Sequence, residues 1–378
     1  MGILEETYIK TKNIENKFKH KKILFIGSEA YDATTISIIE GLNILGFEII
    51  VYKKQNINSW FCNTIINNLD NIEDNVDFIL SNLHWGTRWS LYNSFKHKIP
   101  YILIDGDDRI HGNNISDWMV KYVYNCKKYK LNPPDEIKNI ELSPYRWMES
   151  IGNYKPDKIF MVAKYKINKD CIYIPCGINN TYIEYFNNKE QIKKIYDISN
   201  FPGSGFYRKE LENKLNNYKK TTKYNIWNSK IYGEMMVSDK IKKFCENDKN
   251  IHSWHRWRCC KDYFEKVMSS KIQLLSPVDK YNAPGGVGIK RITEAIAGGN
   301  YILYHVQPDV DDSSYPIEEI SPYSKIKFQD YNEMIKKCEY LLERPDFLEE
   351  KRKECYENGM KYFTSEPIAR YFLWNIIN

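Results

Sequence analysis

The chain has 378 residues, of which 42% are hydrophobic, and this length is sufficient for two globular cores of ordinary size. The formal net charge of +6 comes from 55 basic and 49 acidic residues spread along the whole sequence, which excludes a long single-sign tail and suits phosphate ligands, membranes and nucleic acids equally. The nine cysteines include no C-x-x-C pair, and no segment has about 18 uninterrupted apolar residues, which argues against a zinc ribbon, a disulfide framework and a membrane-spanning helix.

The first half of the sequence predicts a doubly wound parallel sheet. An apolar run at residues 22–26, a helical pattern at residues 34–45 and a second apolar run at residues 48–52 form a compact βαβ unit. Further strand-like runs follow at intervals long enough for helices, at residues 78–80, 101–104, 159–162 and 172–174. Because strands that alternate with helices form parallel sheets, we expect a Rossmann-like domain here.

The second half repeats this alternation after a polar connection at residues 176–194. The predicted strands are residues 195–198, 225–231, 272–275 and 301–304. The predicted helices are residues 208–215, 261–268, 289–297 and 331–343. Both halves therefore predict Rossmann-like domains of the α/β class.

The segment of residues 284–304 has the pattern of a phosphate site. Its glycines let the backbone approach a ligand closely, and a helix begins near Gly288, so the free amides and the dipole of that helix face the loop. Lys290 and Arg291 lie in the first turn and add positive charge beside a pyrophosphate. Glu294 follows on a neighbouring helix face, where its carboxylate could accept hydrogen bonds from a ribose diol.

The same residues also fit a purely structural interpretation. Lys290 and Glu294 are four residues apart and could form a surface ion pair. Gly298 and Gly299 would then only end the helix before a strand. The neighbouring motifs favour the phosphate-site interpretation.

The pattern Arg291-x-x-Glu294-Ala295-x-Ala297-x-Gly299, followed by a strand, resembles the donor-binding segment of group-1 glycosyltransferases. It is most similar to the branch that contains the spore-maturation-protein type. The resemblance implies the GT-B fold, with two Rossmann-like doubly wound domains and an interdomain cleft. It also implies a hexosyltransferase-like enzyme of class EC 2.4.

The order of motifs along the second half also matches this family. Near its start, Gly203, Ser204 and Arg208 resemble the opening of the donor domain, where loop amides could hold a distal phosphate. Near its end, the helical pattern of residues 331–374 resembles the closing helices, the last of which often returns to the first domain. The expected organisation is an acceptor-side domain at residues 1–175, a hinge at 176–194, a donor domain at 195–360 and a returning terminal helix at 361–378.

One position departs from the commoner relatives. The frequent E-x7-E pair lacks its first acid, because Val287, seven residues before Glu294, and its flanking glycines include no acidic residue; the resemblance therefore fixes neither the sugar contact nor retention or inversion at the anomeric carbon. The helix dipole with Lys290 and Arg291 can neutralise a diphosphate without a metal. We therefore expect no cofactor and no metal, with a nucleotide-diphosphate sugar as co-substrate.

The acceptor-side candidates follow strands of the first half, where α/β proteins place their sites. Asp107 and His84 are each a candidate general base for the acceptor hydroxyl. Alternatively, Asp105 and Asp107 could hold a divalent cation, an aspartate could cap a turn, and His84 could be a packed structural residue. Glu29 and Asp32 either line the acceptor side or cap a helix.

We predict a glycosyltransferase that moves a sugar from a nucleotide-diphosphate donor to a glycan or another surface-destined acceptor, lipid-linked or protein. The basic aromatic segment at residues 252–258 could stack a base or a sugar, or could form an ordinary amphipathic loop. Its histidines, together with Cys259 and Cys260, do not form an evident zinc site. The alternatives are a transferase acting on hydroxymethylated DNA bases, a sugar-nucleotide epimerase and a non-catalytic nucleotide-sugar-binding protein. Because residues 1–20 are charged and lack the apolar core of a signal peptide, we expect a cytoplasmic protein, at most peripheral to a membrane.

Overall fold

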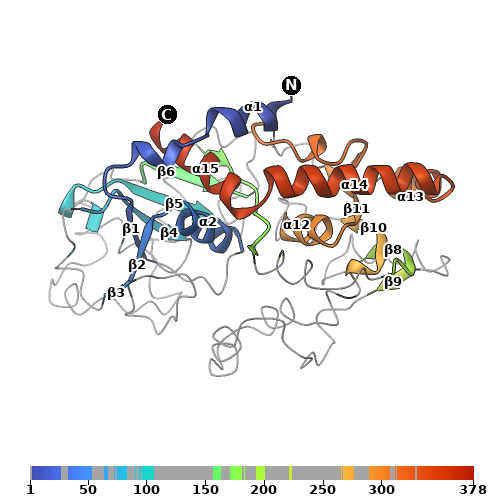
Figure 1. Cartoon of the computed structure of the whole chain (residues 1–378), viewed down its shortest axis with the longest axis horizontal. Coiled ribbons are helices and arrows are strands. Elements are labelled where there is room, and N and C mark those ends of the chain that lie inside the picture. Colours follow the sequence, from blue (N-terminus) through green and yellow to red (C-terminus); the bar gives the residue numbers. More distant parts are fainter. Residues whose placement is uncertain are drawn as a thin grey trace.

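Two parallel sheets, one in each half of the chain, form the framework of the protein (Figure 1). The structure is a computed structural model. It describes residues 2–26, 33–52, 64–66, 72, 75–82, 90, 93–94, 96–105, 156–162, 171–180, 183, 193–200, 221–223, 265, 267–275, 289–306, 311, 313–327 and 330–378.

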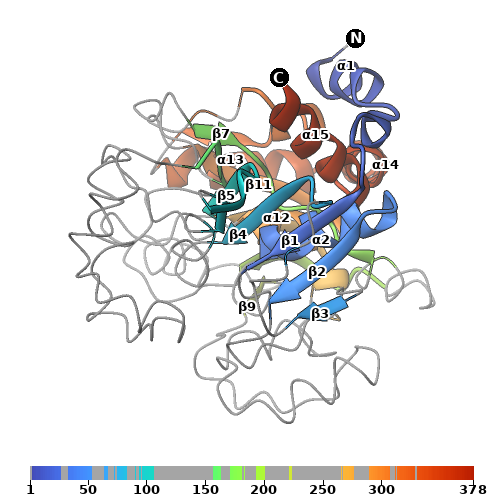
Figure 2. The ribbon, with the colours of Figure 1, turned by 90° about the vertical axis from the view of Figure 1, so that its left-hand side faces the viewer.

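The first sheet has seven strands in the order β3-β2-β1-β4-β5-β6-β7, and β3, β2, β1, β4 and β5 can be followed in this order in Figure 2. Every neighbouring pair is parallel. β4 and β5 are buried along their whole length, because helices cover both faces of such a sheet, and this explains their continuous apolar runs. The strands are β1 (Lys22–Phe25), β2 (Glu48–Tyr52), β3 (Thr64–Ile66), β4 (Phe78–Asn82), β5 (Tyr101–Asp105), β6 (Lys158–Met161) and β7 (Cys171–Tyr173).

The second sheet has five strands in the order β12-β11-β10-β8-β9, again all parallel. The predicted strands at residues 195–198, 272–275 and 301–304 are confirmed within one or two residues, whereas the one predicted at 225–231 lies outside the described residues. The strands are β8 (Tyr196–Asn200), β9 (Thr221–Lys223), β10 (Ser270–Leu275), β11 (Tyr301–Val306) and β12 (Lys325–Lys327).

The described helices of the second half pack closely on one another. α12 contacts α14 at Gly359, where an added Cβ would lie 2.1 Å from Cγ2 of Ile296. α14 begins at Pro345, whose missing N–H is not needed in a first helical turn. Within the described ranges, no helix has both the length and the apolar character to cross a membrane. The helices are α12 (Ile289–Ala297), α13 (Tyr331–Leu342), α14 (Pro345–Tyr362) and α15 (Ser365–Ile377), with a short 3-10 turn, η4 (Ile317–Glu319).

α15 lies against α2 (Ala33–Ile44) of the first half. Gly41 makes this approach possible, because a Cβ there would lie 2.1 Å from the backbone oxygen of Ser365 and 2.6 Å from Cβ of Ala369. The buried Glu40 carboxylate accepts hydrogen bonds from the Ser365 hydroxyl and, at 3.0 Å, from the Asn180 amide. The start of α15 is thus attached to α2 by both packing and polar contacts.

The chain passes between the two halves twice, and the two passages are hydrogen-bonded to each other. Ile178, in the first passage, forms a parallel bridge with Thr364, in the second. The Ile178 amide donates to the Phe363 carbonyl at 2.6 Å, and the Ser365 amide donates to the Ile178 carbonyl at 3.1 Å. This bridge explains why the predicted helical tail is divided into α14 and α15.

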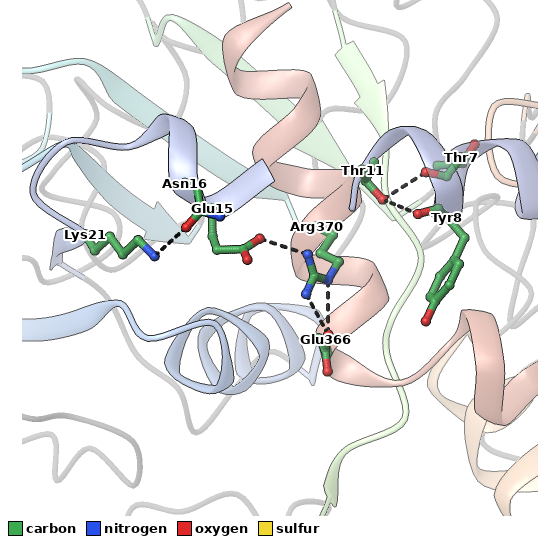
Figure 3. A network of polar contacts seen from close by, with 8 residues as sticks. All are labelled: Thr7, Tyr8, Thr11, Glu15, Asn16, Lys21, Glu366 and Arg370. Carbon is green, nitrogen blue, oxygen red and sulfur yellow. Dashed lines mark hydrogen bonds and ion pairs between the residues drawn. The ribbon is translucent and has the colours of Figure 1, made fainter. Parts of the chain in front are cut away.

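The N-terminal segment includes a helix that the sequence analysis does not predict, α1 (Ile3–Lys10), and contacts two elements of the second half. The Glu319 carboxylate accepts hydrogen bonds from the amides of Ile3 at 2.8 Å and Leu4 at 2.9 Å, which places an anion at the positive end of the helix. Further along, Arg370 of α15 is ion-paired with Glu15 at 2.8 Å and Glu366 at 2.9 Å (Figure 3). The N-terminal segment therefore bridges η4 and α15.

Candidate donor site

The strand order of the second sheet identifies its ligand-binding edge. β8 and β10 are neighbours, with β9 on one side and β11 and β12 on the other, so the order reverses between them. Ligands of open α/β sheets bind beyond the carboxyl ends of the strands at such a reversal. In the sequence, Gly203, Ser204 and Arg208 follow β8, and Gly288 follows β10. These four residues lie outside the described ranges, but the strands that lead to them are adjacent.

α12 begins at Ile289, directly after the second of these loops, so its free amides lie near the carboxyl edge of the sheet. Lys290 and Arg291 occupy its first turn; Arg291 is partly buried, and the side chain of Lys290 lies outside what the structure describes. Glu294 is fully buried, at 0% exposure. Glu294 therefore does not lie on the protein surface, whereas its expected pairing with Lys290 stays a prediction.

The carboxyl end of α12 is closed by a Schellman motif, as the Gly-Gly pair suggests. The Asn300 amide donates to the Ala295 carbonyl and the Gly299 amide to the Ile296 carbonyl, both at 2.9 Å. Gly299 has a φ of +69°, a conformation that favours glycine. The expected helix end at Gly298 and Gly299 is confirmed.

Two cations, which the sequence analysis does not identify, hold this end of the helix. Lys194 Nζ donates to the Gly298 carbonyl and to Oδ1 of Asn300, both at 2.8 Å. Arg352 Nε donates to the Gly299 carbonyl at 2.9 Å. Burial, and after it the charge of Arg352, lowers the pKa of Lys194 well below its usual value. The contacts join positions more than 50 residues apart, so no local pattern reveals them.

The first sheet has its own reversal of strand order, between β1 and β4. The acceptor-side candidates follow these strands: Glu29 and Asp32 come after β1, and His84 comes after β4. All three side chains lie outside the described residues. The topology nevertheless brings the two loops that carry them to one edge of the sheet.

Asp105 ends β5, the next strand along, and is fully buried. It lies beside β4, whose last residue, Asn82, is also buried, so polar side chains gather at this edge. Asp107 lies outside the described residues, which leaves the paired-aspartate cation site a prediction. In the described part of the chain, no group of three or more His, Cys, Asp or Glu residues could hold a metal.

The remaining sequence candidates concern the basic aromatic segment and the cysteines. Residues 252–258, with Cys259 and Cys260, lie outside the described ranges. The four described cysteines are buried thiols rather than disulfides, and burial raises the pKa of Cys355 to about 12.

Several solved structures have the same two-domain architecture. HepE of Anabaena, solved with UDP, has a TM-score of 0.52 at 10% sequence identity, and the alignment covers 94% of this chain and 99% of HepE. An alpha-glucosyltransferase solved with UDP-glucose and DNA containing an abasic site has a TM-score of 0.50 at 10% identity, with 94% and 99% of the two chains covered. No protein-family model matches the chain, and a search of curated proteins finds no match in sequence.

These structures are GT-B glycosyltransferases, and the chain has the GT-B fold, with a doubly wound parallel sheet in each half. The predicted fold class is confirmed. At 10% identity the likeness establishes the architecture alone, so activity has to be argued from the residues.

Proposed function

We propose that the protein is a glycosyltransferase of class EC 2.4 that takes its sugar from a nucleotide-diphosphate donor. One observation carries the proposal: the reversal of strand order in the second sheet lies between the two strands whose loops contain the predicted phosphate-binding residues. The buried Glu294, in the helix that starts there, adds a carboxylate suited to a ribose diol. UDP and UDP-glucose in the HepE structures are ligands of the same chemical class.

The proposed mechanism places the donor diphosphate against the amino end of α12. Amides of that end, with Lys290, Arg291 and Arg208, stabilise the charge that develops on the departing nucleotide diphosphate. Glu294 holds the ribose, and Gly203 and Ser204 contribute loop amides. This set of fixed dipoles and cations supplies the neutralisation of the leaving group without a metal ion.

On the acceptor side, Asp107 or His84 takes the proton of the attacking hydroxyl as general base. A glycan, lipid-linked or protein acceptor remains the leading proposal, with kinship to the spore-maturation-protein-type branch. Hydroxymethylated DNA is the second candidate, supported by the DNA-bound glucosyltransferase of like fold and by the net charge of +6. Binding of duplex DNA that weakens steeply with salt would favour this second acceptor.

Titration calorimetry with a panel of nucleoside diphosphates and their sugars, with EDTA or with Mn²⁺, tests the donor site. Glu294→Gln keeps the volume of the buried side chain but weakens its acceptor strength, so we expect about a tenfold or larger loss of affinity for the preferred nucleotide. Glu339→Gln, an exposed glutamate on α13, is the matched control and should bind like the unmodified protein.

Absence of binding to every nucleotide would reject the proposed function. Binding that requires Mn²⁺ and is unchanged in Glu294→Gln would reject the donor site as assigned, and would direct attention to Asp105 and Asp107. Donor hydrolysis or transfer separates a transferase from a non-catalytic binding protein, and a new sugar nucleotide formed without an acceptor would indicate an epimerase.

A further inference from the structure

Lys194 occupies an unusual position in the connection between the two sheets. It lies after β7 of the first sheet and two residues before β8 of the second, whose following loop carries Gly203, Ser204 and Arg208. Its ammonium group crosses to the end of α12 and donates to a backbone carbonyl and a side-chain amide there. Lys194 thus links the segment that leads into β8 to the helix α12, and both belong to the proposed donor site.

The contacts of Lys194 extend into the middle of the second sheet. Asn300, which accepts from Lys194, donates from Nδ2 to Oε1 of Gln273 at 3.4 Å. Gln273 lies in β10 and is in register with Ser199 of β8 and Ile302 of β11. Both Asn300 and Gln273 are fully buried. The end of α12 is therefore hydrogen-bonded to β10, beside the strand reversal, and to Lys194, two residues before β8.

A charged side chain is a costly way to end a helix that a Schellman motif already closes. Bringing an ammonium group out of water is unfavourable unless hydrogen bonds replace its hydration. Here the Arg352 side chain, only 11% exposed, lies beside the Lys194 ammonium group. Arg352 is ion-paired with Glu349, whose side chain is 69% exposed. Two positive charges therefore lie together at the carboxyl end of α12. The helix itself does not require both of them, because the Schellman motif already closes that end.

We propose that Lys194, supported by Arg352, is a positioning residue for the donor site, holding α12 in the place where its amino end meets the donor diphosphate. The inference rests on the proposed function. α12 spans nine residues, about 13 Å, so a displacement at its carboxyl end moves the whole rigid helix. Misplacement by about 1 Å is enough to lower the efficiency of a binding or catalytic group severely.

The test compares two pairs of variants by nucleotide affinity and by thermal unfolding. Lys194→Met keeps much of the side-chain volume but removes the donors, and Lys193→Met, at the adjacent exposed lysine, is its matched control. We expect affinity for the preferred nucleoside diphosphate to fall about three- to thirtyfold in Lys194→Met and to change less than about twofold in Lys193→Met. Arg352→Met should show a smaller loss, with Lys353→Met, whose side chain is 75% exposed, as control.

A pH profile separates positioning from a purely structural role. Because the pKa of Lys194 is lowered, its proton is lost at less alkaline pH than that of an ordinary lysine, and affinity of the unmodified protein should decline as pH rises into that range. The charged groups that face it are Arg352 and Glu349. Lys194→Met should start low and show no such decline, while Lys193→Met should follow the unmodified protein.

The outcomes distinguish the two proposals. If the unmodified protein binds no nucleotide, the proposed function fails. If it binds, and a folded Lys194→Met binds equally well, the positioning role is refuted while the donor site stands. If Lys194→Met does not fold, two other measurements decide: the nucleotide affinity of the unmodified protein at alkaline pH, and the affinity of Arg352→Met compared with Lys353→Met. An affinity that changes in neither measurement refutes the positioning role.

Discussion

Replacing Gly41 by alanine should weaken the attachment of α15 to α2. The new Cβ would lie 2.1 Å from the Ser365 backbone oxygen, so the helices must separate by about 1.3 Å to restore an ordinary contact of 3.4 Å. The obstacle is backbone, which cannot rotate away, and overpacking of this kind costs about 3 kcal/mol, the upper end of the usual range. The better helix propensity of alanine returns about 1 kcal/mol, which leaves a net loss of about 2 kcal/mol.

Gly359→Ala is the matched comparison, because it places the same methyl group in the middle of another packed helix. Its nearest obstacle, also at 2.1 Å, is the Cγ2 atom of Ile296, and the next atoms are at 3.5 Å or beyond. This Cγ2 methyl group is bonded to the branched Cβ of a buried helical isoleucine and cannot rotate away freely, so Gly359→Ala should also lower the free energy of unfolding, by about 1–2 kcal/mol after the gain in helix propensity.

Urea unfolding followed by circular dichroism measures both variants against the unmodified protein. We expect a lower midpoint for both variants, with Gly41→Ala affected at least as much as Gly359→Ala. A Gly41→Ala variant as stable as the unmodified protein would show that α15 is not held against α2 at this distance.

Two further predictions concern charged and titratable groups. Burial lowers the pKa of His305 to about 4, although the nearby charges of Asp330 and Glu333 act to raise it, whereas histidine in the unfolded chain titrates near 6.5. The unfolded state therefore binds more protons between these pH values, and the free energy of unfolding should fall by roughly 3 kcal/mol as pH drops from about 7 to 4. His305→Leu should flatten this part of the pH dependence of stability, and an unchanged slope would contradict the assignment. Glu319→Gln removes the anion from the amino end of α1 and should lower the free energy of unfolding by about 0.5–1 kcal/mol at low ionic strength, an effect that 1 M NaCl should largely abolish.

The strands of the two sheets were predictable because their sequences are apolar for a physical reason. β4, β5 and β11 are covered on both faces, so a continuous apolar run marks each of them. β3, β9 and β12 have three residues each and include threonine or lysine, so no continuous apolar run marks them. α1, with eight residues, is too short to be stable alone and depends on Glu319, more than 300 positions away.

The same distinction applies to the candidate donor site. The start of α12 and its end at Gly299 depend on neighbouring residues, so glycine and charge patterns were sufficient to predict them. The burial of Glu294 and the contacts of Lys194 and Arg352 depend on how distant segments pack. The division of the helical tail at Thr364 depends likewise on its bridge to Ile178.

The packing of α15 on α2 has a consequence for the order of folding during synthesis. Residues 34–42 of α2 are all buried, and α15, their main covering helix, begins at Ser365. A ribosome therefore completes more than 300 further residues before it releases the helix that covers this apolar surface. Until then the first half of the nascent chain carries an open face, the kind of surface that chaperones bind.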